Sequence, residues 1–593
     1  MSQDFKKSLI LDDRLCCTDK LEYGVVKGGQ NMTPQVYQAI SASPSSHTYN
    51  LQIPSEQTVI DRRVLWNSTV RLKFTTPAGA NAVPVNQYPI HYGLTDALAP
   101  FPLHQLTTVQ SCTVNNNTVS LNTRDVLPAL MRMNDKRQLM RYNGTTPVMF
   151  DTYGKYSDAV GAINNPLGSY GNIGDNDLHP RGAFVVNAIY GGTPNAPVAL
   201  PVGDGASALT FYVEFTTTEP LLVSPFIWAN PQSNNMGFYG IQNMNFVFNI
   251  GDCSRVWRSA NPWMASTVIT VDSFSNSRLI LNQLTPHPSQ LLPSRNVVPY
   301  YTLPRYITQF NQIVNPAYTV NAGLVSINPS TSGTVISSTN IQLNQIPDKV
   351  IIFVRKALGS QTPNDTDSFL AIRGISINFN NQSGILSTAT PYDLYRYSVN
   401  AGSNQSFDEF YGLANRVGVA GLEPVPTTGS LLCLDFAEAI QLNDDFYASG
   451  SLGNFQFQFN LSCVNQFNSQ DANWELVLIT VNSGLFVCER GTSSSYTGIL
   501  TRQDVLDVST QEPTSSASVR RMIGGGFLDT LKSVAGKVHK HLPALAGVAK
   551  HGLSMIDNPK AQAVSKAIGS MGYGRSGGGM SGGRRHKLED KLM

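Results

Sequence analysis

The first strong pattern along the chain is an alternation of apolar and polar residues over residues 51–74, LQIPSEQTVIDRRVLWNSTVRLKF. In its second half, Val70, Leu72 and Phe74 alternate with charged residues. A period of two is typical of a β-strand with one buried face. The segment therefore predicts two strands, separated by a short polar turn at residues 54–56.

A weaker relative of this pattern lies at residues 341–356, IQLNQIPDKVIIFVRK, and it also places an Ile-Pro before a β-branched run. Each copy is followed by the same series of a strand, an Asn turn, a short strand and a helix, at residues 109–133 and 369–399. The turns are expected at 115–117 and 380–381, because Asn tolerates a positive φ. This recurrence predicts two copies of one β-sandwich, with no parallel βαβ rhythm.

Each copy also carries one predicted short helix. The first is expected to have Thr123 as its N-cap, followed by an apolar face made by Val126, Leu127, Leu130 and Met131. The second is expected to have Thr390 as its N-cap, with Pro391 at the first helical position.

The remaining predicted strands and loops indicate the domain boundaries of the chain. Strands are predicted at 183–190, 208–216, 243–250, 266–271, 278–284, 335–343, 349–354, 429–436, 454–463, 474–480 and 485–488. Long loops are predicted at 134–181 and 400–428, and loops of this length are usually functional. Because proline is poor in central strands, the proline-rich stretch that ends near 306 is expected to be a linker. The predicted division is a 1–46 arm, a first sandwich at 47–284, a linker at 285–306, a second sandwich at 307–507 and a tail at 508–593.

Composition supports this all-β reading and narrows the chemistry. Only 14% of the 593 residues are charged, against a usual ~25%, which suits short strands, turns and loops. The seven cysteines include no CxxC pair, so they predict buried thiols rather than a zinc site. Nucleotide-loop and hydrolase motifs are absent in a strand-to-helix context. We therefore expect no catalytic residue, no cofactor and no metal.

The tail differs in charge from the body. Residues 519–593 carry 13 Lys and Arg against 4 Asp and Glu, a net charge of +9, which leaves −7 for the rest of the chain. Within 527–548, apolar residues recur every three or four positions and predict an amphipathic basic helix. The Gly-rich end, residues 572–593, is expected to be disordered on composition. Such a tail suits nucleic acid, an acidic membrane or an acidic partner.

Several short blocks, taken in order, resemble one known family. They are VVKGGQ at 25–30, PSEQTVIDRRVLW at 54–66, VNNNTVSLNTRDVLPAL at 114–130, NNPLG at 164–168, HPRG at 179–182 and NFNNQSGIL at 378–386. Together they resemble the double jelly-roll major capsid proteins of virophages and Polinton-like viruses, in the lineage that includes adenovirus hexon. The resemblance spans roughly residues 24–507.

The resemblance implies a fold, an assembly and a location. The fold would be two tandem eight-stranded jelly rolls with short helices, long loops and a basic, partly helical C-terminal tail. Three chains would form a pseudo-hexameric homotrimer, and the trimers would build the icosahedral shell of a double-stranded DNA virus. The implied partners are neighbouring capsomers, penton or vertex proteins, minor capsid proteins and a viral protease. With no signal-peptide pattern and no apolar stretch of about 18 residues, we expect the protein to be made inside the host cell and to reside in the virion.

The tail contains two stretches that are similar to the recognition pattern of adenovirus-type cysteine proteases. The first places Met522 and Gly524 before a candidate cut between Gly525 and Gly526. A second candidate lies between Gly583 and Arg584. Glycines let an extended strand enter a narrow protease cleft, and the alternative is a flexible hinge. The basic residues that we expect to contact DNA or a membrane are Lys532, Lys537, Lys540, Lys550, Arg584 and Arg585.

A second reading is a carbohydrate-binding or carbohydrate-active β-sandwich protein, because jelly rolls also serve as lectins and glycosidases. That reading requires exposed tryptophans near paired carboxylates. The five tryptophans are Trp66, Trp228, Trp257, Trp263 and Trp474. Four of the five lie in or beside strand-like runs and are expected in the core. Asp61 and Arg62, beside the first repeat, are expected to hold a turn or a subunit contact.

Overall fold

The structure is a computed structural model. It describes residues 31–134, 150–156, 186–226, 237–286, 292–320, 327–329, 333–418, 421–436, 438–442, 447–498, 500–501 and 505.

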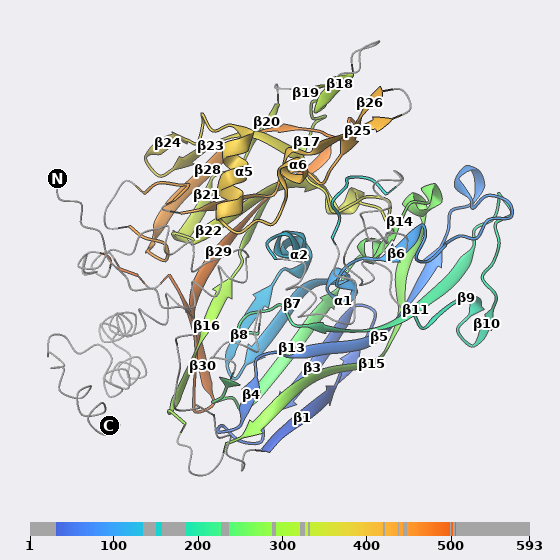
Figure 1. Ribbon diagram of the computed structural model, residues 1–593. Coiled ribbons are helices and arrows are strands. Elements are labelled where there is room, and N and C mark those ends of the chain that lie inside the picture. Colours follow the sequence, from blue (N-terminus) through green and yellow to red (C-terminus); the bar gives the residue numbers. More distant parts are fainter. Residues whose placement is uncertain are drawn as a thin grey trace, which may run out of the picture.

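In these residues the first sandwich consists of two facing sheets (Figure 1). The eight-stranded sheet contains β1 (Asn31–Gln38), β4 (Val59–Asp61), β5 (Leu65–Thr75), β9 (Ala188–Thr193), β10 (Ala196–Val198), β11 (Thr210–Pro220), β12 (Gly237–Phe238) and β15 (Val268–Thr285). The five-stranded sheet contains β2 (Ser41–Ala42), β3 (Ser46–Gln52), β7 (Thr107–Val114), β8 (Asn117–Leu121) and β13 (Asn243–Ile250). All of the pairings between these strands are antiparallel.

The second sandwich has the same plan. Its six-stranded sheet contains β16 (Arg295–Thr302), β17 (Arg305–Asn311), β22 (Lys349–Lys356), β27 (Leu432–Asp435), β29 (Asn473–Glu489) and β30 (Thr492–Thr497). Its five-stranded sheet contains β20 (Thr334–Ser337), β21 (Ile341–Gln345), β23 (Ala371–Phe379), β24 (Gln382–Ile385) and β28 (Leu452–Val464). Separate hairpins pair β18 (Tyr318–Val320) with β19 (Ile327–Pro329), and β25 (Leu413–Gly418) with β26 (Gly421–Pro426).

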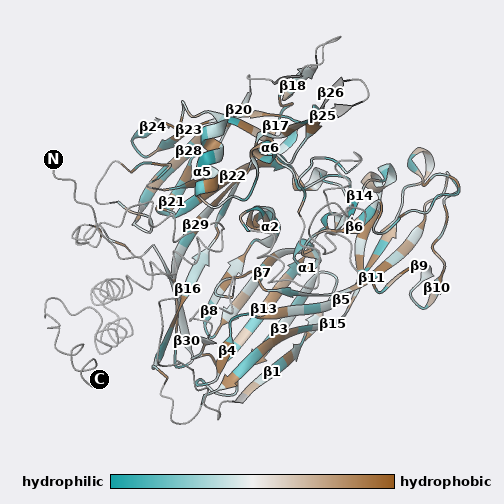
Figure 2. Ribbon diagram, viewed as in Figure 1, coloured by the Kyte–Doolittle hydropathy of each residue, from teal (hydrophilic) through white to brown (hydrophobic). Residues whose placement is uncertain are grey.

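The two predicted strands of residues 51–74 are confirmed, but they are not neighbours in one sheet. β3 pairs with β13 in one sheet, whereas β5 pairs with β11 and β15 in the other. The chain therefore crosses the sandwich at its Ile-Pro turn. The repeat at 341–356 does the same, because β21 and β22 also lie in opposite sheets. The crossing lets both strands contribute apolar residues to one core, because Leu51 of β3 and Leu72 of β5 belong to the same buried cluster. Figure 2 shows the alternation of hydropathy along the strands as bands of colour.

The helices and Asn turns largely follow the prediction. Helix α5 (Pro391–Asn400) begins with Thr390 as its N-cap, and the Thr390 hydroxyl and the Asp393 carboxylate form a capping box. The N-cap of helix α2 (Thr123–Arg132) is Asn122, so the prediction of Thr123 was wrong by one residue. At the two turns, Asn115 and Asn380 have φ values of 53° and 50°.

Other boundaries differ from the sequence-based prediction. Strand β1 extends the first sandwich into the segment assigned to the 1–46 arm. Within the predicted linker at 285–306, residues 295–302 form strand β16 and pair with β29. Its Pro299 is tolerated because β16 lies at the edge of its sheet. The predicted loop at 400–428 contains helix α6 (Phe407–Tyr411) and the β25–β26 hairpin.

Strands β22 and β29 are buried on both faces. In β22, Val350, Ile352 and Val354 belong to the core of the second sandwich, whereas Ile351 and Phe353 belong to the cluster centred on the first sandwich. That cluster also includes apolar residues of α2, which lies between the two sandwiches in Figure 1. This explains the uninterrupted apolar run of β22, since a strand covered on both sides has no polar face. The two sandwiches therefore share a continuous apolar interface.

A long ribbon adds a second connection between the sandwiches. Strand β29 pairs with β17 and β22 through its first half, and with β16 and β30 through its second half. The second half runs down beside the first sandwich (Figure 1). There, the Ser493 amide of β30 donates to Asn116 Oδ1 at 2.8 Å, and the Gly491 amide donates to the Gly240 carbonyl at 3.2 Å. Strands of the second sandwich thus form hydrogen bonds at the Asn turn of the first.

The close packing of the ribbon predicts that a side chain at Gly484 lowers the stability of the fold. A Cβ at this position would lie 1.9 Å from the Tyr496 carbonyl oxygen, a backbone atom that cannot move without breaking the pairing. Gly484→Ala is expected to lower the free energy of unfolding by about 1–3 kcal/mol, in the range of overpacked sites. Gly374→Ala in β23 is the matched control, because its nearest neighbour would lie 3.9 Å away. Denaturant unfolding measures both, and equal effects would contradict the prediction.

Candidate functional site: the charged junction between the two sandwiches

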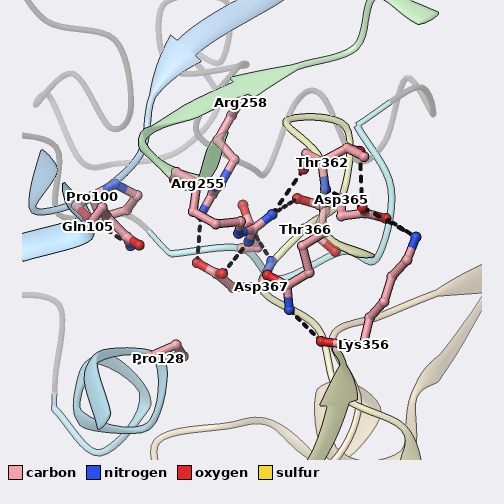
Figure 3. Close-up of polar contacts among 12 residues, drawn as sticks. Pro100, Gln105, Pro128, Arg255, Arg258, Lys356, Thr362, Asp365, Thr366 and Asp367 are labelled. Atoms are coloured by element: carbon pink, nitrogen blue, oxygen red, sulfur yellow. Dashed lines mark hydrogen bonds and ion pairs between the residues drawn. The ribbon is translucent and has the colours of Figure 1, made fainter. Parts of the chain in front are cut away.

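A group of largely buried charges lies where the two sandwiches meet (Figure 3). Arg255 belongs to the 3-10 turn η4 (Ser254–Val256), and Arg258 belongs to strand β14 (Trp257–Ser259), which pairs with β6 (Asp96–Leu98). Asp367 comes from the loop between η6 (Leu358–Ser360) and β23 of the second sandwich. The side chains of both arginines are at most 3% exposed, and that of Asp367 is 9% exposed.

Asp367 joins the two sandwiches through both of its carboxylate oxygens. Arg258 Nη2 donates to Oδ2 at 2.9 Å, and Arg255 Nη2 donates to Oδ1. Arg255 also donates to the carbonyl of Asp365 at 2.7 Å. Burial alone would raise the pKa of Asp367, but the arginines Arg258, Arg255 and Arg132 hold it well below its ordinary value. This carboxylate is therefore ionised and fixed at any physiological pH.

Arg132, at the end of α2, extends the junction. Its guanidinium donates to the backbone carbonyls of Pro128 at 3.1 Å and of Asp367, and it lies 4.7 Å from the centroid of the Phe369 ring. Asp151 Oδ2 accepts hydrogen bonds from the Tyr156 hydroxyl at 2.6 Å and from the Asp367 amide at 2.8 Å. Burial raises the pKa of Asp151, while Arg258 opposes this shift.

A second ion cluster connects α2 to the six-stranded sheet of the second sandwich. Asp125, in the first turn of α2, accepts from Arg355 of β22 and from Arg305 of β17. Arg355 Nε also donates to Glu475 of β29 at 3.0 Å. A buried ion network adds little net stability compared with an apolar contact, but it fixes the geometry, because any other arrangement leaves a buried charge unpaired. The junction therefore sets one orientation of the two sandwiches.

The structure shows the contacts of Asp61 and Arg62, for which structural roles were predicted. Asp61 Oδ1 accepts from the Arg63 amide at 2.9 Å, which confirms that it holds a turn. Arg62 is 6% exposed, and its Nε donates to the Pro225 carbonyl at 2.8 Å. Burial lowers the pKa of Arg62 to about 10, with Tyr301 of β16 opposing the shift. The Arg62 side chain is thus buried within its own chain, and the alternative of a subunit contact stays a prediction.

Two buried histidines and one buried glutamate titrate abnormally. Burial lowers the pKa of His47 and of His104 to about 4, and it raises the pKa of Glu219 to about 8. His104 Nε2 lies 3.8 Å from Glu219, but it donates instead to the Pro220 carbonyl at 2.7 Å. A neutral imidazole fits that bond and its low pKa, so the contact with Glu219 is not an ion pair.

These shifts predict a pH dependence. Because the folded state resists protonating the two histidines, their contribution to stability is complete above the unfolded pKa of 6.5 and is lost as the pH falls toward 4. The contribution of Glu219 has the opposite sign, and it is lost as the pH rises from 4.5 toward 8. His47→Phe should remove one titrating group. It keeps an aromatic ring at a position where the centroid of the His47 ring lies 4.1 Å from that of Phe274. Unfolding temperatures between pH 4 and 6.5 should fall less steeply in the variant, and an unchanged slope would refute this assignment.

The tail residues predicted to be cleaved, or to contact DNA or a membrane, lie outside the described residues. They are the cleavage candidates Met522, Gly524, Gly525, Gly526, Gly583 and Arg584, and the DNA or membrane candidates Lys532, Lys537, Lys540, Lys550, Arg584 and Arg585. Within the described part of the chain, no group of three or more His, Cys, Asp or Glu could hold a metal ion. No described helix is long and apolar enough to span a membrane.

The tryptophans do not favour the carbohydrate reading. Trp66, Trp257 and Trp474 are at most 3% exposed, and Trp263 is partly buried, with its indole N–H donating to the Pro89 carbonyl at 2.8 Å. Trp228 lies outside the described residues. The described tryptophans therefore offer no stacking platform for a sugar.

Sequence reasoning missed the junction itself. Arg258 and Asp367 lie 109 residues apart, and no motif connects them. A signal did exist in the segment CSRVWRS at 253–259, where two arginines flank an apolar pair in a chain that is poor in charge. Charged residues inside such a run suggest buried ion pairs.

Comparison with known proteins identifies the family. Residues 3–290 match the family model for the first domain of the Sputnik virophage major capsid protein, and residues 303–484 match that for the C-terminal domain of major capsid protein V20. The interval between the two matches falls inside the proline-rich segment. The putative capsid protein V20 of Sputnik virophage is 28% identical over 612 aligned positions, which cover 97% of this chain and 95% of that protein.

Solved structures show the same fold. The cryo-EM structure of the Sputnik virophage matches with a TM-score of 0.74 at 24% identity, covering 87% of this chain and 98% of that one. The crystal structure of the mavirus major capsid protein matches with a TM-score of 0.67 at 14% identity, covering 87% and 100%. With both domains present in order, the chain belongs to the virophage major capsid proteins, double jelly-roll proteins that build the virion shell and are not enzymes.

Proposed function

We propose that three copies of this chain form a pseudo-hexameric trimer, and that these trimers tile an icosahedral shell. A trimer with six similar corners requires each chain to supply two sandwiches at a constant angle. The observation that carries the proposal is the double connection between the sandwiches, through the Asp367 junction and the β29 ribbon. A flexible pair of domains would not give six equivalent corners.

Native mass spectrometry of the purified full-length protein tests the trimer. The expected species has three times the 64.5 kDa mass of the chain. A protein that stays monomeric at every concentration at which it remains soluble would contradict the proposal. The uncleaved protein should be used, so that loss of the tail does not change the mass.

The proposal gives the tail an internal place in the shell. Its net charge of +9 against a body of −7 suits a role beneath the shell, where it would contact DNA or a membrane through Lys532, Lys537, Lys540, Lys550, Arg584 and Arg585. A viral cysteine protease would remove part of it after Gly525, with Gly583 as the second candidate. Penton or vertex proteins and minor capsid proteins would bind the outer loops and edges of the trimers.

Intact-mass spectrometry of purified particles tests the cleavage. A chain that ends at Gly525 is expected, and a full-length mass in every mature particle would exclude it. Gly524→Val should prevent this cut, because a branched residue hinders entry of the extended strand into the cleft. Gly582→Val serves as the matched control for the second site and should leave the first cut intact.

A further inference from the structure

A small cavity lies at the junction between the two sandwiches. Its volume is about 20 Å³, enough for one water-sized species, which needs about 10–15 Å³. Arg124 and Pro128 of α2, Arg255 of η4 and Arg355 of β22 line it, so both sandwiches contribute to its wall. The other lining residues are Gln105, Leu358, Gln361, Asp367, Ser368 and Phe369.

Two of the lining arginines carry buried N–H groups with no hydrogen-bond partner among the described residues. Arg355 pairs through Nε with Glu475 and through Nη2 with Asp125, but its Nη1 has no partner. Arg124 Nη2 lies 3.4 Å from Asp252, whereas its Nε is buried without a partner. The Arg355 side chain is 3% exposed. Buried donors of this kind destabilise the folded state unless an acceptor reaches them.

The charge of the lining itself favours an anion as that acceptor. Three arginines and one carboxylate line the cavity, and their direct ion-pair partners, Arg258, Asp125, Asp252 and Glu475, bring the totals to four arginines and four carboxylates. Asp367 also lines the cavity, but both of its oxygens already accept from arginines. The lining therefore presents more positive than negative charge to the space inside.

We propose that this cavity binds a single monatomic anion, chloride under ordinary conditions, which accepts from the guanidinium groups of Arg124 and Arg355. A water molecule could accept from them too, but it carries no charge to offset the excess of arginines over carboxylates in the lining. The anion would join α2 of the first sandwich to β22 of the second, and it would enter beside Arg124, whose side chain is 19% exposed.

Thermal unfolding of the full-length protein tests the site, with chloride exchanged for gluconate at constant ionic strength. Because a ligand that binds only the folded state stabilises it by mass action, the unfolding temperature should rise with the logarithm of the chloride concentration, and bromide should replace chloride. Arg124→Gln should abolish this dependence while the protein still folds. Arg355 is unsuitable for substitution, since its loss would leave Asp125 and Glu475 without their buried partner.

Arg71→Gln provides the matched control. Arg71 forms an ion pair with Asp272 at 2.6 Å on the first sandwich, with a side chain that is 26% exposed, so its substitution should leave the chloride dependence intact. A crystal grown in bromide should show an anomalous peak within the cavity. Equal stability in chloride and gluconate, persistence of the chloride effect in Arg124→Gln, or a cavity that holds only water would each overturn the proposal.

Discussion

Replacing Asp367 with Asn is expected to lower the free energy of unfolding by about 3–5 kcal/mol, the usual cost of removing one partner of a buried ion pair. Asn keeps the size of the side chain but removes the charge that neutralises Arg255 and Arg258. Both arginines would then lose the carboxylate with which they form ion pairs. Because the three residues come from the two sandwiches, the same change should reduce the yield of assembled trimers.

Asp272→Asn is the control for this prediction. Asp272 also pairs with an arginine, Arg71, but both side chains are 26% exposed. Exposed pairs contribute about 0–1 kcal/mol, so little loss is expected. Denaturant unfolding followed by tryptophan fluorescence measures both variants. Similar losses in Asp367→Asn and Asp272→Asn would show that the junction is not a special point of the fold.

Trp66→Ala is the second large effect that we expect, with a loss of about 3–5 kcal/mol. Trp66 is fully buried in β5, and its ring lies 4.7 Å from the Phe248 centroid and 5.6 Å from that of His47. These contacts connect the two sheets of the first sandwich, so the cavity left by Ala could not close without moving both sheets.

Trp263→Ala tests whether burial, rather than the loss of any tryptophan, causes that effect. Trp263 belongs to the 3-10 turn η5 (Pro262–Ser266) and is only partly buried. Its substitution should cost clearly less than Trp66→Ala, since part of the ring already contacts solvent. Thermal unfolding of the two variants compares them directly. A larger loss for Trp263→Ala would mean that the core has been placed incorrectly.

The sequence was most informative where local chemistry determines the structure. Alternation identified β5, and the Thr390 capping pattern located the start of α5. It was misleading in β15, where the polar run at 272–277 suggested a break between two strands. The strand continues through that run with two irregularities in register, because both halves pair with β5. Pairing across a sheet is a long-range effect that a local pattern does not contain.

The arrangement of the two sandwiches left only an indirect trace in the sequence. The unbroken apolar run of β22 is typical of a strand that is buried on both faces, but it does not say which element covers it. Likewise, nothing local connects Arg258 with Asp367. The junction is built from residues of ordinary type that only the folded chain brings together, whereas the family resemblance came from short blocks whose order along the chain was sufficient.

A reconstruction of the assembled particle would show whether each chain supplies two sandwiches fixed at one angle. We expect trimeric capsomers with six corners, two from each chain, and density for the β29 ribbon crossing between the sandwiches in every copy. Capsomers with one chain at each corner, or sandwiches whose relative angle varies between copies, would contradict this expectation.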